Sequence, residues 1–183
     1  MGIRGSPRRG GNSDVLLSWF LSCSGTHDVE VLTPSQLSIH FCQGCRYCER
    51  TGRCVIDDDV AWISQVLLEA DRVVVSTPVF FYGLPASLKA LVDRMQVLWA
   101  RRYILGETMK PKDGFLLAVG ATKGERLFEG VTLTVRYFFD AFGCVLRGSL
   151  FFRGFDAPNI GECKACAREV QAQGESFLRG DGT

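Results

Sequence analysis

Apolar and polar residues follow two different patterns along this chain. Continuous apolar runs such as RVVVSTPVFF (72–81) and GFLLAVGAT (114–122) are typical of strands buried on both faces of a parallel sheet. Other stretches place apolar residues three or four positions apart, as in ERLFEGVTLTVRYFFDAFG (125–143), which indicates helices that bury one side. The two kinds of segment alternate along the chain.

This alternation predicts five strands and five helices. The predicted strands cover residues 1–4, 28–34, 72–81, 114–122 and 144–154. The predicted helices cover residues 15–23, 57–71, 85–103, 125–143 and about 160–178. Such an order favours an α/β fold, an open parallel sheet with helices on both faces. We predict a single domain over residues 1–183, with ligands bound at the carboxyl ends of the strands.

Composition and charge narrow the function classes. Of 183 residues, 46% are hydrophobic and 22% are charged, and the formal net charge is +1. The chain has no excess of basic residues that would indicate a nucleic-acid partner. None of its apolar runs is long enough to span a membrane. The basic N-terminus is followed by glycine and polar residues, unlike a secretory signal. We therefore expect a cytoplasmic protein whose thiols stay reduced, which argues against disulfides in the cysteine-rich segment.

The first predicted strand ends in a loop suited to a terminal phosphate. GSPRRGGNS (5–13) stands directly before a predicted helix, so backbone amides at the helix N-terminus are available. It adds side-chain donors from Ser6, Arg8, Arg9, Asn12 and Ser13. It matches neither GxxxxGK[ST] nor GxGxxG, so ATP and a Rossmann-bound dinucleotide are not the first interpretation. An ordinary turn with solvated arginines is the alternative.

Two further loops leave the same predicted edge of the sheet. STPVFFYGLP (76–85) offers aromatic faces and backbone groups to a planar ring, although core packing explains Phe80, Phe81 and Tyr82 equally well. GATKGE (120–125) is a glycine-containing turn between a strand and a helix. Three loops at one edge favour a ligand site more than any one of them alone.

The segment CQGCRYCERTGRC (42–54) holds four cysteines in the spacing Cys42-x2-Cys45-x2-Cys48-x5-Cys54. Structural zinc usually takes two well-separated Cys-x2-Cys pairs, whereas consecutive x2 steps resemble the ferredoxin-type run that surrounds an iron–sulfur cubane. Zinc and free or redox-active thiols stay open as alternatives. A second pair, Cys163-x2-Cys166, is interpreted mainly as one face of a terminal helix, with a metal or redox role as the alternative.

From Gly5 to about Gly154 the motifs above resemble, in order and spacing, the flavodoxin-like NAD(P)H-dependent FMN reductases, and within them the iron–sulfur flavoproteins. The resemblance implies a three-layer fold with strand order 2-1-3-4-5 and bound FMN. It implies that Ser6, Arg8, Asn12 and Ser13 hold the phosphate. It also implies that the flavin ring is lined by Pro78, Val79, Phe80 and Tyr82, with Gly120, Ala121 and Thr122 at its other edge. The same resemblance assigns Cys42, Cys45, Cys48 and Cys54 to a [4Fe–4S] cluster.

The function implied is electron transfer between NAD(P)H or ferredoxin and a small acceptor such as a quinone, a flavin or an oxygen species. No catalytic side chain is required, because the chemistry takes place at FMN N5. A clusterless FMN or quinone reductase is one alternative, and a non-catalytic electron carrier or redox sensor is another. The resemblance also implies a homodimer or homotetramer. The helix with Lys89, Asp93 and Arg94 resembles a dimerisation helix of the family, or else presents a solvated polar face.

Overall fold

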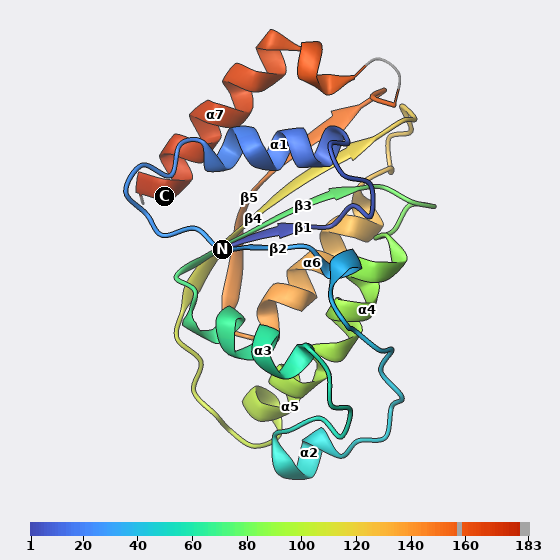
Figure 1. Ribbon diagram of the computed structural model, residues 1–183, viewed down its shortest axis with the longest axis vertical. Coiled ribbons are helices and arrows are strands. Elements are labelled where there is room, and N and C mark those ends of the chain that lie inside the picture. Colours follow the sequence, from blue (N-terminus) through green and yellow to red (C-terminus); the bar gives the residue numbers. More distant parts are fainter. Residues whose placement is uncertain (157–158, 180–183) are drawn as a thin grey trace.

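A five-stranded parallel sheet with strand order β2-β1-β3-β4-β5 forms the middle layer of the protein (Figure 1). The computed structural model describes residues 1–156 and 159–179. The strands are β1 (Gly2–Arg4), β2 (Val31–Leu32), β3 (Arg72–Pro78), β4 (Lys112–Gly120) and β5 (Cys144–Arg153). The predicted fold class and strand order are confirmed.

The order of burial along the strands follows from their place in the sheet. In β3 the residues from Val73 to Thr77 are all buried, because neighbouring strands flank them and helices cover both faces. At the edge of the sheet, β5 instead places exposed residues such as Val145 and Arg147 between more buried ones. The short β1 is central, and its Ile3 is fully buried.

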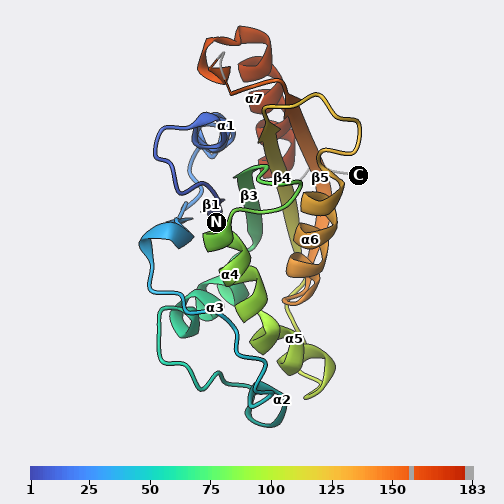
Figure 2. The same cartoon turned by 90° about the vertical axis from the view of Figure 1, so that its right-hand side faces the viewer.

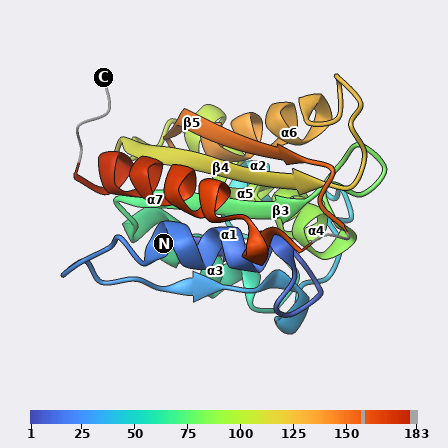
Figure 3. The ribbon, with the colours of Figure 1, turned by 90° about the horizontal axis from the view of Figure 1, so that it is seen from above.

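Two helical layers enclose the sheet (Figures 1 and 3). One face carries α1 (Asn12–Leu21) and α7 (Lys164–Arg179). The other face carries α3 (Val60–Glu69), α4 (Ala86–Arg94), α5 (Gln96–Tyr103) and α6 (Glu129–Asp140). The short helices are η1 (Pro34–Gln36), α2 (Cys48–Thr51) and η2 (Ile160–Glu162). Among the described residues, no helix is long and apolar enough to cross a membrane.

A separate apolar cluster lies on each face of the sheet. Between the sheet and the α1–α7 layer, the rings of Phe20, Phe115 and Phe177 lie in mutual contact, with Phe20 and Phe115 centroids 4.8 Å apart. The two helices approach closely at Gly174, where a Cβ would lie 2.8 Å from the carbonyl oxygen of Phe20. A side chain there would push α7 away from α1.

Several predicted elements differ from the structure in their bounds, among them the strand expected over residues 72–81, which ends at Pro78. The helix expected over residues 85–103 is divided at Met95, whose N–H donates to both Leu91 O and Val92 O and whose ψ is 1°. The second strand is limited to Val31–Leu32 because only two of its residues pair with β1. The terminal helix is preceded by η2, so Cys163 stands before α7 rather than on its face.

Candidate functional site

The loop between β1 and α1 is fixed against the end of β3. Gly5 N–H donates to Ser76 O at 2.7 Å, and a Cβ on Gly5 would lie 2.9 Å from that oxygen and 2.7 Å from Leu88 Cδ2. Only glycine allows this approach. The Ser76 hydroxyl in turn donates to Ser13 O at 2.7 Å. These two bonds hold the start of α1 at the carboxyl end of β3.

Donor groups in this loop remain available for an anion. The Arg8 amide donates to Ser6 Oγ at 3.0 Å and the Gly10 amide donates to Asp14 Oδ2 at 2.9 Å. Within residues 1–156 and 159–179, the amides of Gly11, Asn12 and Ser13 have no acceptor. The Arg8 side chain is exposed and has no ion-pair partner in that same part of the chain. First-turn amides beside a free guanidinium fit a phosphate group.

The buried carboxylate of Asp14 organises the loop, a role that the sequence reasoning missed. Besides accepting from Gly10, its Oδ1 lies 3.5 Å from Arg4 Nε, and its side chain is 8% exposed. Its charge is therefore balanced by Arg4 instead of opposing an anion at the helix N-terminus. An acidic residue in the first helical turn was the only sequence signal for it.

The β3–α4 loop is a tight hairpin that exposes three aromatic side chains. Phe80 and Gly83 exchange two backbone hydrogen bonds, at 3.0 and 2.9 Å, around Phe81 and Tyr82. Both turn residues have positive φ, 49° and 61°, as a type I′ turn requires. Phe80, Phe81 and Tyr82 are 46%, 106% and 53% exposed. The core-packing alternative for these residues is wrong, because they lie at the tip of the turn and away from both apolar clusters.

The third loop lies against the second and against β5. Val79 N–H donates to Val119 O at 2.9 Å, and a Cβ on Gly124 would lie 2.9 Å from Tyr82 Oη. Gly154 N–H donates to Gly120 O at 2.8 Å. Ala121 and Thr122 are exposed between these contacts. Figure 3 shows the three loops together at one edge of the sheet, which we call the loop edge (residues 5–13, 78–85 and 120–125).

The four clustered cysteines line one cavity of about 500 Å³, which we call the cysteine pocket. It lies between residues 42–56 and helices α4 and α5. Figure 2 shows α2, whose Cys48 and Glu49 line the cavity, at the end of the molecule opposite α7. Cys42 and Cys45 are exposed, while Cys48 and Cys54 are half-buried. The remaining lining includes apolar side chains from both sides of the cavity: Val55, Ile56, Val97 and Trp99.

The four thiols do not converge on one point in this structure. No group of three Cys, His, Asp or Glu side chains in the described ranges is placed to hold one metal ion. A zinc site needs four ligands converging on one point, whereas a cubane is bound at four separate corners. Burial raises the pKa of Cys48, and negative charge on Cys54, Cys42 and Cys45 raises it further. The Cys48 thiol is therefore protonated at neutral pH, and a bound metal would have to displace that proton.

A buried ion pair closes the inner side of the cysteine pocket. Arg94 donates to both carboxylate oxygens of Asp58, at 2.7 and 3.0 Å, and to Cys54 Sγ at 3.4 Å. The Arg94 and Asp58 side chains are 1% and 0% exposed. Burial would raise the pKa of Asp58, but hydrogen bonds from Arg94, the His40 amide and the Val60 amide lower it to about 2. The carboxylate is thus held ionised beside the thiols.

The interpretation of Arg94 as part of a solvated polar face is wrong. Its side chain turns inward at the last residue of α4, where the helix breaks before α5. Lys89 and Asp93 form an exposed pair at 2.6 Å, as a solvated polar face requires, and the dimerisation role of this helix stays a prediction. The helix α4 begins at Ala86, next to the loop edge, and spans about 13 Å to Arg94 at the cysteine pocket.

Comparison with known proteins assigns the chain to a family. Residues 1–150 match the NADPH-dependent FMN reductases. The chain belongs to this family. An iron–sulfur flavoprotein from Methanocaldococcus jannaschii is 34% identical over 125 residues, which cover 67% of this chain and 62% of that protein. The match therefore spans less than two thirds of the relative's length.

Solved structures agree with this FMN reductase fold. A flavone reductase superposes with a TM-score of 0.72 at 18% identity, covering 97% of this chain and 61% of that chain. An FMN-dependent NADH-azoreductase from Bacillus anthracis, in complex with FMN, gives a TM-score of 0.70 at 12% identity and covers 97% and 98% of the two chains. At these identities the likeness shows the fold alone.

The structure brings the predicted site residues together in two groups. Eleven predicted FMN contacts lie on the loop edge: Ser6, Arg8, Asn12, Ser13, Pro78, Val79, Phe80, Tyr82, Gly120, Ala121 and Thr122. The four predicted cluster ligands line the cysteine pocket. Their roles toward a cofactor stay predictions. Asp58 and Phe81 were not singled out, since neither a long-range ion pair nor an aromatic type I′ turn has a local sequence signature.

Proposed function

We propose that this chain binds FMN at the loop edge and a [4Fe–4S] cluster in the cysteine pocket. It transfers electrons between NAD(P)H or ferredoxin and a small acceptor, such as a quinone, a flavin or an oxygen species. The observation that carries the proposal is that all four cysteines of the run line one cavity in a chain of the FMN reductase family. A reducing compartment such as the cytoplasm would keep these thiols available for a cluster.

The chain's own groups bind and position the cofactors. The amides at the start of α1 and the Arg8 guanidinium bind the phosphate, and Asp14 orients the loop through the Gly10 amide. Phe80 and Tyr82 provide aromatic surface to the ring system, opposite Thr122. Arg94 donates to the sulfur of Cys54 from inside the protein. When bound, FMN exchanges electron pairs as hydride and a cluster exchanges single electrons.

We also propose that a second copy of the chain covers α5 and α6. Their exposed face carries large apolar side chains: Trp99 is 38% exposed, Tyr137 66% and Leu133 57%. Lys89, Asp93, Trp99 and Tyr137 border one groove between α4, α5 and α6. Within one chain, α4 separates the loop edge from the cysteine pocket. Trp99 also lines the cysteine pocket, so a partner on this face would lie next to the proposed cluster site.

The FMN site is tested by fluorescence titration of flavin with variants of the first loop. We expect Arg8→Ala and Ser13→Ala each to weaken FMN binding about tenfold, the loss typical of one hydrogen bond to a charged group. Ser18→Ala is the matched control, because Ser18 lies on the same helix but is exposed and bonds to Asp14 O. Equal affinity in all three variants would reject the loop as the phosphate site.

Steady-state kinetics separates this proposal from its alternatives. We expect turnover of NAD(P)H or reduced ferredoxin with a quinone acceptor. Turnover by protein with flavin but no iron would favour a clusterless reductase. Reduction without turnover, with any donor, would favour an electron carrier or sensor.

A further inference from the structure

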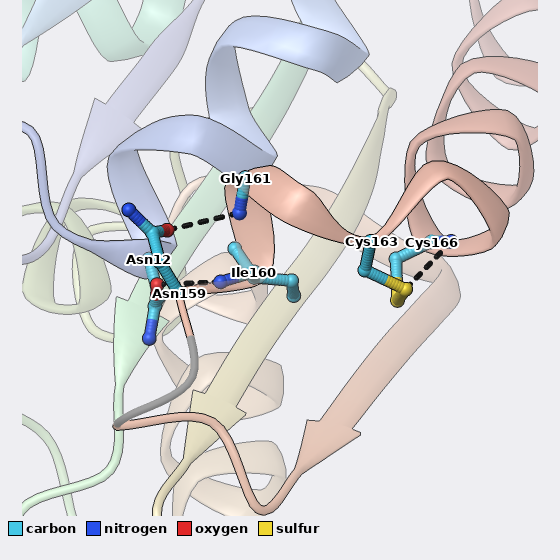
Figure 4. The surroundings of a disulfide bond; sticks show 6 residues. All are labelled: Asn12, Asn159, Ile160, Gly161, Cys163 and Cys166. Atoms are coloured by element: carbon cyan, nitrogen blue, oxygen red, sulfur yellow. Dashed lines mark hydrogen bonds between the residues drawn. A yellow bond between two sulfur atoms is a disulfide. The ribbon is translucent and has the colours of Figure 1, made fainter.

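The Cys163–Cys166 pair lies outside the region that matches the FMN reductase family. The two residues form a disulfide, with Cα atoms 5.3 Å apart (Figure 4). The pair follows η2, whose Ile160 N–H donates to Asn12 Oδ1 at 3.0 Å. η2 is therefore beside the N-terminus of α1, and the disulfide follows it at the start of α7 (Figure 4). The α1 and α7 layer lies on the face of the sheet opposite α4 and α5 (Figure 1).

The surroundings of Cys163 stabilise a thiolate. It directly precedes the 16-residue helix α7, and the Cys166 amide donates to Cys163 Sγ at 3.2 Å. An amide aimed at the sulfur and the positive end of a helix both favour the ionised form. The neighbours Glu162 and Lys164 carry opposite charges. Together they add no net charge that would disfavour the ionised form of Cys163.

The two sulfurs differ in accessibility. Cys163 is half-buried, whereas Cys166 is 8% exposed and belongs to the apolar cluster with Ile160, Val170 and Phe177. Cys163 is thus the more accessible of the two residues to an external thiolate. This division, with an accessible first cysteine and a buried second one, suits a pair that opens and closes without unfolding.

A purely structural role explains the pair poorly. The two cysteines are three positions apart, and a cross-link that closes so short a loop restricts the unfolded chain least. Backbone hydrogen bonds already hold the segment, since Cys163 N–H donates to Ile160 O at 2.9 Å and Ala167 N–H donates to Cys163 O at 3.0 Å. The fold of this segment does not depend on the disulfide.

We propose that Cys163 and Cys166 form a second redox site, which exchanges electrons with dithiols and disulfides. A thiolate of an external dithiol attacks Cys163 Sγ, the intramolecular S–S bond breaks, and Cys166 leaves as a thiolate that takes up a proton. The second thiolate of the reductant then attacks the mixed disulfide and releases Cys163. Two electrons and two protons pass from the dithiol to the pair, and a disulfide substrate reverses the sequence.

The test uses the full-length protein as purified, equilibrated without denaturant in mixtures of reduced and oxidised dithiothreitol. Free thiols are alkylated and mapped by mass spectrometry, and trypsin separates Cys163 from Cys166 at Lys164. We expect both cysteines to pass together and reversibly between protected and alkylated forms. A pair that stays oxidised until the protein unfolds, or that never oxidises, would overturn the proposal.

A second measurement isolates the attacking sulfur. In Cys166→Ser, we expect Cys163 to react with an aromatic disulfide at neutral pH at least about tenfold faster than Cys23 of the same protein. Cys23 is the internal control because it is also half-buried but lies after the C-terminus of a helix, α1. Equal rates would contradict an activated Cys163, and a Cys163→Ser variant should abolish the reversible change at Cys166.

Discussion

At the scale of single residues, Arg94 is the largest fully buried side chain in the described part of the chain, and it carries a charge. It joins Asp58 and Cys54, which come from a different part of the sequence. We expect Arg94→Gln to lower the free energy of unfolding by about 3–5 kcal/mol, because it leaves the Asp58 carboxylate buried without its partner. Urea unfolding measures this loss.

The exposed pair Lys89–Asp93 on the same helix provides the control. Lys89→Gln should cost only about 0.3–0.5 kcal/mol, since exposed ion pairs contribute little. Equal losses for the two variants would show that the Arg94 pair does not stabilise the fold.

The Asp58 carboxylate also predicts an acid response. Its pKa of about 2 lies below the ordinary value of 3.8, so the pair stabilises the folded state above pH 4. This stabilisation is lost as the pH falls from about 4 through 2. We expect the free energy of unfolding to decrease over this range in the native protein and to decrease less in Asp58→Asn. Parallel pH curves for the two proteins would contradict this assignment.

Only part of the Asp58–Arg94 arrangement could be predicted from the sequence. The acidic residues 57–59 were correctly expected at a helix start, and Asp58 Oδ1 does accept from Val60 N–H at 3.1 Å. The pairing with Arg94 joins residues 36 positions apart. No local pattern distinguishes an arginine on a solvated helix face from one that turns inward at a helix break.

At the scale of elements, the turn at Phe81 and Tyr82 holds two non-glycine residues in the left-handed region. We expect Phe81→Gly to raise the free energy of unfolding by about 0.5–1 kcal/mol. Relief of about 1–2 kcal/mol of backbone strain exceeds the entropic cost of glycine, and the exposed ring loses no packing. Phe80→Gly has no such strain to relieve and should destabilise, as urea unfolding would show. Destabilisation by both variants would contradict a strained turn.

The position of this turn could not be predicted from the pattern of apolar residues. The run RVVVSTPVFF was expected to be one strand, but β3 ends at Pro78 and the aromatic residues form the hairpin tip. Apolar periodicity cannot distinguish a buried strand from exposed aromatics that follow it. Backbone strain retained in exposed residues points to contact with a ligand or partner, in agreement with the proposed loop edge.

At the scale of the whole molecule, the alternation of strands and helices predicted a parallel sheet covered on both faces, and the resemblance to the FMN reductases implied the strand order. The placement of the four cysteines around one cavity could not be predicted from the sequence, since it depends on how residues 42–56 pack against α4 and α5. The sequence left a redox role for Cys163 and Cys166 only as an alternative, because the same spacing suits a helix face.

The association of two copies is a prediction at this scale. We expect sedimentation equilibrium to give a dimer or a tetramer, and Tyr137→Asp to shift it toward monomer, because a charge would then enter the α5–α6 face. Arg147→Asp is the control, on the exposed edge strand β5 outside that face. A monomeric native protein would contradict the proposed interface.

The central claim is that one chain holds both FMN and an iron–sulfur cluster. The most direct measurement is anaerobic purification followed by assays of flavin, iron and acid-labile sulfide per chain. We expect about one FMN, four irons and four sulfides per chain, with the iron and sulfide lost in Cys48→Ala while FMN remains. Flavin without iron would contradict the cluster, and colourless protein that takes up no added FMN would contradict the whole assignment.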